Sequence, residues 1–177
     1  MNNNGNTALH IASASDEWDS KLCAAVLLKH GANVHFKTLD KRTPLLLASE
    51  YGRAPAAKLL LEHKANVHDK AFDDMTPLLF ASKNGHDDIV SLLLEYNVDI
   101  VEDKTRKDNM TPLHFAVKGN FTQIVNLLLQ KGANRRAMAK FGNAYVTPLI
   151  FACQYGYEDI ASLIEWDVLK RQLALLL

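Results

Sequence analysis

The chain is poor in the features that mark secreted, membrane-spanning or nucleic-acid-binding proteins. It has only two cysteines, Cys23 and Cys153, far apart in the sequence. Each lies in a mostly apolar stretch, which predicts two buried thiols in a reducing compartment rather than a disulfide frame. Twenty basic and twenty acidic residues cancel to a formal net charge of zero, so no overall field draws in nucleic acid or anionic lipid. We therefore expect neither a nucleic-acid partner nor membrane insertion.

The chain also lacks long apolar runs. None approaches the roughly 20 residues that a membrane-spanning helix requires. The first ten residues, MNNNGNTALH, show no basic region followed by an apolar core, as a signal peptide would. These absences predict a cytoplasmic chain, and they leave a nuclear location open.

Motifs of catalysis and of phosphate binding are absent as well. The sequence contains no GxGxxG, GxxxxGK[ST], HExxH or CxxC, so we predict no enzyme and no cofactor. Two histidine pairs, His30 with His35 and His63 with His68, occupy matching places in the sequence. Zinc needs ligands that converge on one point, and a pair five residues apart across a helix end does not favour this. We predict no metal site.

What the chain does contain is a block that recurs from end to end. The block begins with threonine and places leucine and alanine at fixed offsets, at intervals of 33 to 36 residues. The five copies are TALHIA from Thr7, TPLLLA from Thr43, TPLLFA from Thr76, TPLHFA from Thr111 and TPLIFA from Thr147. Self-similarity at this period indicates a repeat architecture. We call each of these a threonine block and the residues that follow it a unit.

Each unit contains a second apolar block further along the chain. These blocks read AAVLLKHGANV (24–34), AAKLLLEHKANV (56–67), DIVSLLLEYNVDI (88–100), QIVNLLLQKGANR (123–135) and, more loosely, DIASLIEWDVL (159–169). Their apolar residues follow the spacing of the buried stripe of a short helix. Each unit is therefore predicted to hold two short helices and a polar connector.

The residues at the predicted helix ends agree with this division. Threonine is a good N-cap, and the proline that usually follows suits the first helical position. The first helices are predicted to end at residues that tolerate turns: Asp16, Gly52, Gly85, Asn120 and Gly156. The second helices are predicted to end near Gly31, Lys64, Asn97 and Gly132. Among these Lys64 is the exception, and we expect it to carry a small left-handed strain.

On these residues the chain resembles an ankyrin-repeat array. The resemblance rests on the Thr-Pro-Leu-x-x-Ala blocks and on the closing segments Gly31-Ala32-Asn33-Val34 and Gly132-Ala133-Asn134. It implies an all-α repeat solenoid, a stack of helix-turn-helix units joined by β-hairpin-like connectors. It also implies that the histidine in the fourth place of a threonine block, at His10 and His114, hydrogen-bonds locally and ties adjacent repeats. The single array would cover residues 1–177, with units at about 5–40, 41–73, 74–108, 109–144 and 145–177.

The resemblance implies a non-catalytic protein–protein interaction module, a monomer that binds a partner protein through its concave face and connector tips. The family's contact positions, carried over place by place, are Arg42, Met75 and Met110 before the threonines, Glu50, Tyr51, Lys83, Asn84, Lys118, Gln154 and Tyr155 near the first-helix ends, and Phe72 and Tyr145 at the tips. For Met75 and Met110 two interpretations stay open: they contact the partner, or they pack against the neighbouring connector.

An alternative function also remains open. The array would then be a regulatory or targeting segment of a larger protein, such as an enzyme, a ligase adaptor or a channel, and would contact its own chain. A terminal repeat normally shows a polar outer face. Residues 167–177, DVLKRQLALLL, are instead rich in leucine, and this favours the alternative.

The recurring leucine of the threonine block is predicted to fill the space between units. Shortening it in Leu78→Ala or Leu113→Ala should cost about 2 to 5 kcal/mol of stability, as large-to-small core substitutions do. Urea denaturation of each variant beside the parent chain measures this cost. A loss no larger than that of a surface substitution, about 0.5 kcal/mol, would show that these leucines lie outside the core.

Overall fold

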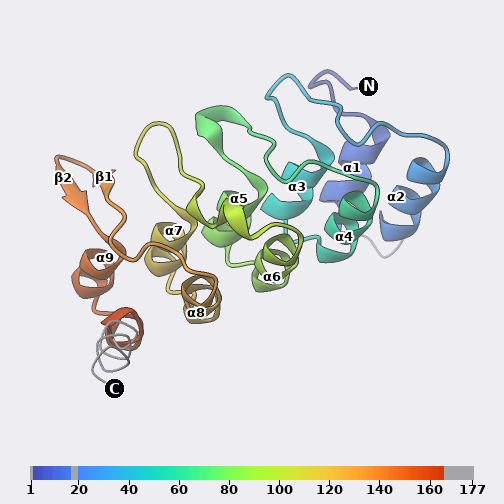
Figure 1. Cartoon of the computed structure of the whole chain (residues 1–177). Helices are drawn as coiled ribbons and strands as arrows, with labels where there is room; N and C mark the ends of the chain where they lie inside the picture. The colour runs from blue at the N-terminus through green and yellow to red at the C-terminus, as the bar shows by residue number, and fades with distance from the viewer. Residues whose placement is uncertain (1, 17–19, 166–177) are drawn as a thin grey trace.

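The computed structural model of the chain describes residues 2–16 and 20–165. Their helices lie side by side in a row (Figure 1). Successive pairs are α1 (Ala8–Ala14) with α2 (Ser20–Lys29), α3 (Pro44–Glu50) with α4 (Ala54–Glu62), α5 (Pro77–Asn84) with α6 (Asp87–Tyr96), and α7 (Pro112–Lys118) with α8 (Thr122–Gln130). After them come α9 (Pro148–Tyr155) and helical residues 158–165. The predicted all-α repeat solenoid is confirmed.

The connectors between helix pairs all project to the same side of the row (Figure 1). Two contain short 3₁₀ helices, η1 (Phe72–Asp74) and η2 (Val98–Glu102). The last contains the antiparallel strands β1 (Ala139–Phe141) and β2 (Ala144–Val146), with Lys140 opposite Tyr145. This hairpin and its counterparts stand above the first helices as a row of fingers.

Threonine begins the first helix of every unit, as predicted. Each threonine has an extended backbone, and its hydroxyl accepts a hydrogen bond from the N–H three residues later. Past the helix ends, the left-handed backbone expected there occurs at Gly52, Gly85, Asn120, Gly156, Gly31, Gly132 and the predicted exception Lys64. The second helix of the third unit ends next to Asn97, as predicted, but the backbone of Asn97 is extended rather than left-handed, with a φ of −157°. The chain leaves α6 extended there, because η2 begins at the next residue.

Stacking of the units buries the repeated apolar positions. The first helices contact one another in the order α1, α3, α5, α7, α9, and the second helices contact one another alongside them. Fully or almost fully buried are the alanines Ala12, Ala48, Ala81, Ala116 and Ala152 and the leucines Leu9, Leu45, Leu78 and Leu113. They belong to one continuous core. No single unit could build this core alone, because each unit's apolar faces are covered by its neighbours.

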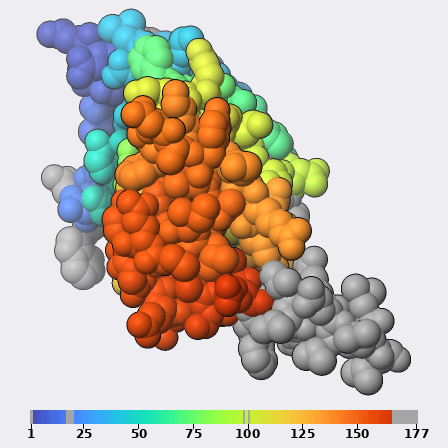
Figure 2. All heavy atoms as spheres, turned by 90° about the vertical axis from the view of Figure 1, so that its left-hand side faces the viewer, coloured from blue at the N-terminus to red at the C-terminus, as the bar shows by residue number. Residues whose placement is uncertain are grey.

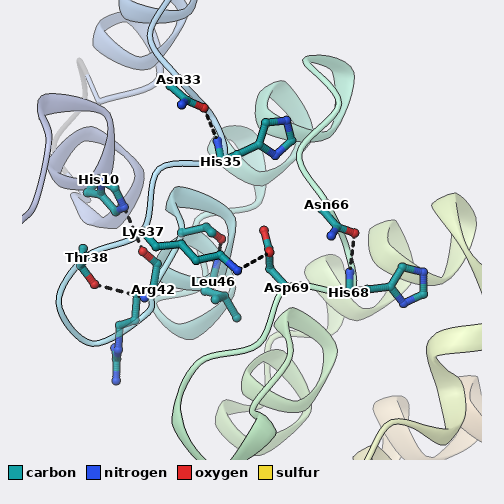
Figure 3. Close-up of polar contacts among 11 residues, drawn as sticks. His10, Asn33, His35, Lys37, Thr38, Arg42, Leu46, Asn66, His68 and Asp69 are labelled. Carbon is teal, nitrogen blue, oxygen red and sulfur yellow. Dashed lines mark hydrogen bonds and ion pairs between the residues drawn. The ribbon is translucent and has the colours of Figure 1, made fainter.

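Two buried histidines link neighbouring units. The ring Nδ1 of His10 lies 2.8 Å from the Thr7 hydroxyl, and its Nε2 lies 3.1 Å from the carbonyl oxygen of Arg42 in the next unit (Figure 3). His114 repeats this arrangement with Thr111 at 2.8 Å and the Val146 carbonyl at 3.3 Å. Since a carbonyl only accepts, Nε2 carries the proton in both rings. The predicted role of these histidines is confirmed.

The prediction of buried cysteines is wrong, because Cys23 and Cys153 are both exposed. Cys23 shares the outer face of α2 with exposed neighbours, while Ala24 and Leu28 turn inward. Cys153 stands at the place where Ser49, Ser82 and Val117 are covered in other units. Among the described residues no further unit stacks on α9 to cover it in the same way. The leucine-rich residues 167–177 lie outside the described part of the chain.

Burial lowers the pKa of both histidines, that of His114 to about 4 against an ordinary value of 6.5, and the hydrogen bonds to backbone carbonyls only partly oppose this. Above pH 6.5 His114 is neutral in both states and adds no pH dependence. Between pH 6.5 and about 4 the unfolded chain binds a proton that the folded chain does not, so stability falls as pH falls. At about 1.4 kcal/mol per pKa unit, the loss from His114 is roughly 3 kcal/mol.

Replacing His114→Leu should remove this part of the acid sensitivity. Leucine is tolerated at the same place in other units, where Leu46 and Leu79 are fully buried. Urea denaturation of both proteins at pH 7 and pH 4.5 should show a smaller difference between the two pH values for the variant. An unchanged difference would show that His114 is protonated as easily in the folded chain as in the unfolded one.

Candidate partner-binding groove

The fingers and the first helices enclose a groove along one side of the stack. Its main hollow has a volume of about 630 Å³ and is lined by residues from the first to the fourth unit. We call this hollow the groove. A smaller hollow of about 350 Å³ lies between the first two units, where Ile11, Leu47 and Tyr51 contribute to its wall. Viewed from the α9 end, the last finger stands above α9 (Figure 2).

The floor of the groove is aromatic and methionine-rich. Met75 is 8 % exposed and packs with Leu46, Leu79 and Phe80, and Met110 is 5 % exposed. Their side chains therefore pack mainly against their neighbours, and only their edges face the groove. The half-buried Phe115 completes the floor beside them. A partner-binding role for the two methionines, limited to these edges, stays a prediction.

Basic side chains border this floor at the ends of the first helices. Arg42 forms an ion pair with Glu50, and its guanidinium lies 5.4 Å from the centre of the Phe80 ring. Lys83 and Lys118 are exposed and also line the groove. Within residues 2–16 and 20–165, neither lysine has a carboxylate oxygen within 4 Å of its ammonium group. The ammonium of Lys118 instead lies 5.0 Å from the centre of the Phe141 ring.

Hydrogen bonds between neighbouring fingers hold the tips together. The backbone N–H groups of Arg106 and Lys107 donate to the carbonyl and the carboxylate of Asp73, at 3.0 and 2.8 Å. Arg106 also pairs with Asp74 at 2.9 Å and thereby lowers the pKa of the Asp74 carboxyl. The next finger is joined by a 2.7 Å bond from the Lys140 N–H to the Asp108 carbonyl. The rim of the groove is thus built from fingers that constrain one another.

The remaining predicted contact residues have different surroundings. Tyr51 borders the smaller hollow, and Phe72, 60 % exposed, borders the groove. Asn84 donates its side-chain amide to the Glu50 carbonyl at 2.8 Å. Tyr155 stacks between Phe151 and Tyr157. Neither hollow is lined by Glu50, Asn84, Tyr145, Gln154 or Tyr155, although all five are at least partly exposed.

The sequence prediction of contact residues did not include Phe80 and Phe115, which lie on the groove floor. The signal was present, because both stand in the fifth place of their threonine block, three residues before Lys83 and Lys118. Residues three apart share a helix face. Because aliphatic residues, Ile11 and Leu47, hold this place in the first two units, the sequence alone does not distinguish a core residue there from a groove residue.

The second histidine of each recurring pair lies in a turn that an asparagine side chain holds. The side chains of Asn33 and Asn66 accept hydrogen bonds from the backbone N–H groups of His35 and His68, at 2.8 and 3.0 Å (Figure 3). The same turn thus occurs in successive units. In the described part of the chain no three histidine, cysteine, aspartate or glutamate side chains cluster as metal ligands would.

Comparison with protein families agrees with this architecture. A family model described as ankyrin repeats (3 copies) matches residues 18–104 and 100–168. The chain belongs to the ankyrin-repeat family. A search of curated proteins gave no match. The family match does not fix the number of units in this ankyrin array, so the count of five and the boundaries given above stay predictions.

Membership places the array among domains that generally mediate protein–protein interaction and are typically non-catalytic. Over residues 2–16 and 20–165, no helix is both long enough and apolar enough to cross a membrane. The groove of the array, rather than a catalytic cluster, is therefore the candidate functional site.

The different burial of Met75 and Phe72 gives a direct test of the groove floor. Met75→Ala should lower stability by about 2 to 5 kcal/mol, since it leaves a cavity between packed side chains. Phe72→Ala should change it by no more than about 0.5 kcal/mol, as exposed substitutions do. Urea denaturation of the two variants measures both effects. Equal effects would contradict the placement of Met75 beneath the groove surface.

Proposed function

We propose that the ankyrin array is a non-catalytic interaction module that binds a partner protein along the groove and the smaller hollow beside it. The observation that carries this proposal is the groove itself, an open hollow of about 630 Å³ with an aromatic and methionine floor and lysines at its border. Aromatic and methionine side chains supply contact area that adapts to a partner.

The rigidity of the rim supports the same function. Because neighbouring fingers are already hydrogen-bonded to one another, few backbone segments would have to be ordered when a partner binds. Binding sites that are formed in advance lose less conformational entropy on association. The Arg42–Glu50 ion pair has the same effect, since it holds in place the long side chain of Arg42, which lines the groove.

A second candidate function is that of a regulatory or targeting segment that contacts its own, longer chain. The face of α9 supports it. Ile150 is 45 % exposed, whereas Leu46, Leu79 and His114 at the same place in earlier units are fully buried. Such a face would suit a covering segment, and the two functions differ in the surface that they use.

Two tyrosines of equal exposure separate these surfaces. Tyr51 borders the smaller hollow and is 49 % exposed, and Tyr96 lies on the second helix α6 and is 48 % exposed. A partner captured from cell extract, identified and purified should bind Tyr51→Ala about tenfold more weakly, the loss typical of a contact residue. Tyr96→Ala should bind it as the parent chain does. Calorimetric titration gives the affinities, and thermal melting confirms that both variants remain folded.

An unchanged affinity for Tyr51→Ala together with a loss for Tyr96→Ala would contradict the groove as the binding surface. A loss confined to Ile150→Asp would favour the α9 face and the second candidate function.

A further inference from the structure

The charges along the groove change between the second unit and the next two. In the second unit the place before the threonine holds Arg42, and the place seven residues after it holds Glu50; these two side chains neutralise each other. In the third and fourth units the corresponding pairs are Met75 with Lys83 and Met110 with Lys118. Arginine is thus replaced by methionine and glutamate by lysine. The result is two cations without the internal partner that the second unit provides.

These cations lie beside an apolar surface. Phe80 and Phe115 stand three residues before Lys83 and Lys118 on the same helices and line the groove with them; Phe115 is half-buried, whereas Phe80 is 7 % exposed and presents only its edge. Lys118 is additionally held over the Phe141 ring. A partner's carboxylate that reaches these lysines from the groove would form a charge-assisted hydrogen bond with them. Apolar side chains next to that carboxylate on the partner would cover the neighbouring apolar surface and exclude water from the contact.

Acidic groups of the array do not already fill this role. Asp40, Asp73 and Asp108 also line the groove, but each stands three residues before a threonine, on a finger rather than at a helix end. Their carboxylates are not within 4 Å of the ammonium groups of Lys83 or Lys118, and the Asp73 carboxylate accepts the Lys107 N–H. The two lysines therefore remain available to a ligand on the helix side of the groove.

The spacing of the lysines indicates the shape of the occupant. Both stand at the same place on stacked helices, and packed helices lie about 8 to 10 Å apart. Seven residues of α-helix cover about 10.5 Å and return to the same face. In an extended strand, residues of one face recur at about 7 or 13 Å, which fits less well.

We propose that the groove binds an acidic amphipathic helix of a partner protein. Two carboxylates of this helix, seven residues apart, would contact Lys83 and Lys118, and its adjoining apolar stripe would cover Phe80 and Phe115. This inference rests on the proposed function, since it names the class of partner segment that the groove takes.

Peptide selection on the whole chain tests the inference. A phage library of helical peptides is selected on the parent chain, and the recovered peptides are synthesised with a fluorophore for anisotropy titration. The test variant is Lys83→Glu with Lys118→Glu. The matched control is Lys58→Glu with Lys131→Glu, two lysines at the second helices α4 and α8 that are likewise exposed. Because all four lysines are exposed, circular dichroism should show both variants folded.

The expected peptides carry two acidic residues seven apart beside an apolar stripe. Their affinity should fall about tenfold or more on the test variant, change less than about twofold on the control, and weaken as salt is added. The same peptides with lysine in place of the two acidic residues should bind the test variant better than the parent chain.

Three results would overturn the inference. In the first, the recovered peptides lose affinity on Phe72→Ala but lack paired acidic residues or bind the test variant as well as the parent chain. This result would refute the acidic helix and leave the proposed function standing. Peptides indifferent to both Phe72→Ala and Tyr51→Ala would refute both. In the third, no acidic peptide is recovered and the chain binds anionic phospholipid vesicles through Lys83 and Lys118. The groove would then bind a membrane surface rather than a protein helix.

Discussion

The burial of each unit's apolar face by its neighbour is the interaction on which the rest of the structure depends. The first helices stack in the order α1, α3, α5, α7, α9, and Leu45, Leu78 and Leu113 disappear from solvent between them. Stacking in one register brings equivalent residues of successive units into line. The histidine bridge to the next unit's backbone, the row of fingers and the line of side chains along the groove all result from that alignment.

Because alignment is fixed by the core, the surface positions can vary without loss of the fold. The residues seven places after the threonines illustrate this freedom: Glu50, Lys83 and Lys118 occupy equivalent places and differ in charge. In the second unit the acidic residue forms an ion pair with Arg42. In the next two units the basic residue faces the groove. The same backbone position is thus neutralised by an ion pair in one unit and carries an unpaired lysine in the next two. We propose that this difference makes the groove selective for an acidic partner segment.

Much of the fold follows from patterns that are local in the sequence. Threonine followed by proline is enough to locate the start of a first helix, and even the left-handed Lys64 follows from its place at a helix end. Asn97 departs from the pattern because its conformation depends on the 3₁₀ helix η2, which the neighbouring residues do not predict. Cys153 departs because its exposure depends on what stacks against α9, a property of the neighbouring unit and not of its own.

The candidate site was less predictable than the fold for the same reason. The position before each threonine was recognised, yet whether Met75 and Met110 face a partner or a neighbouring connector depends on packing between units. Phe80 and Phe115 occupy an apolar position, so their sequence pattern does not distinguish a core residue from the floor of an open groove. Charge was easier to interpret, since Lys83 and Lys118 have no place in a core.

Hydrogen–deuterium exchange of the array with and without its bound partner tests the central claim most directly, namely that the aligned fingers and first-helix ends form the binding surface. The account predicts that protection increases over residues 71–75 and 105–110 and at the ends of α5 and α7, while α4, α6 and α8 exchange as in the free chain. Increased protection confined to α4, α6 and α8, with the fingers unchanged, would contradict it.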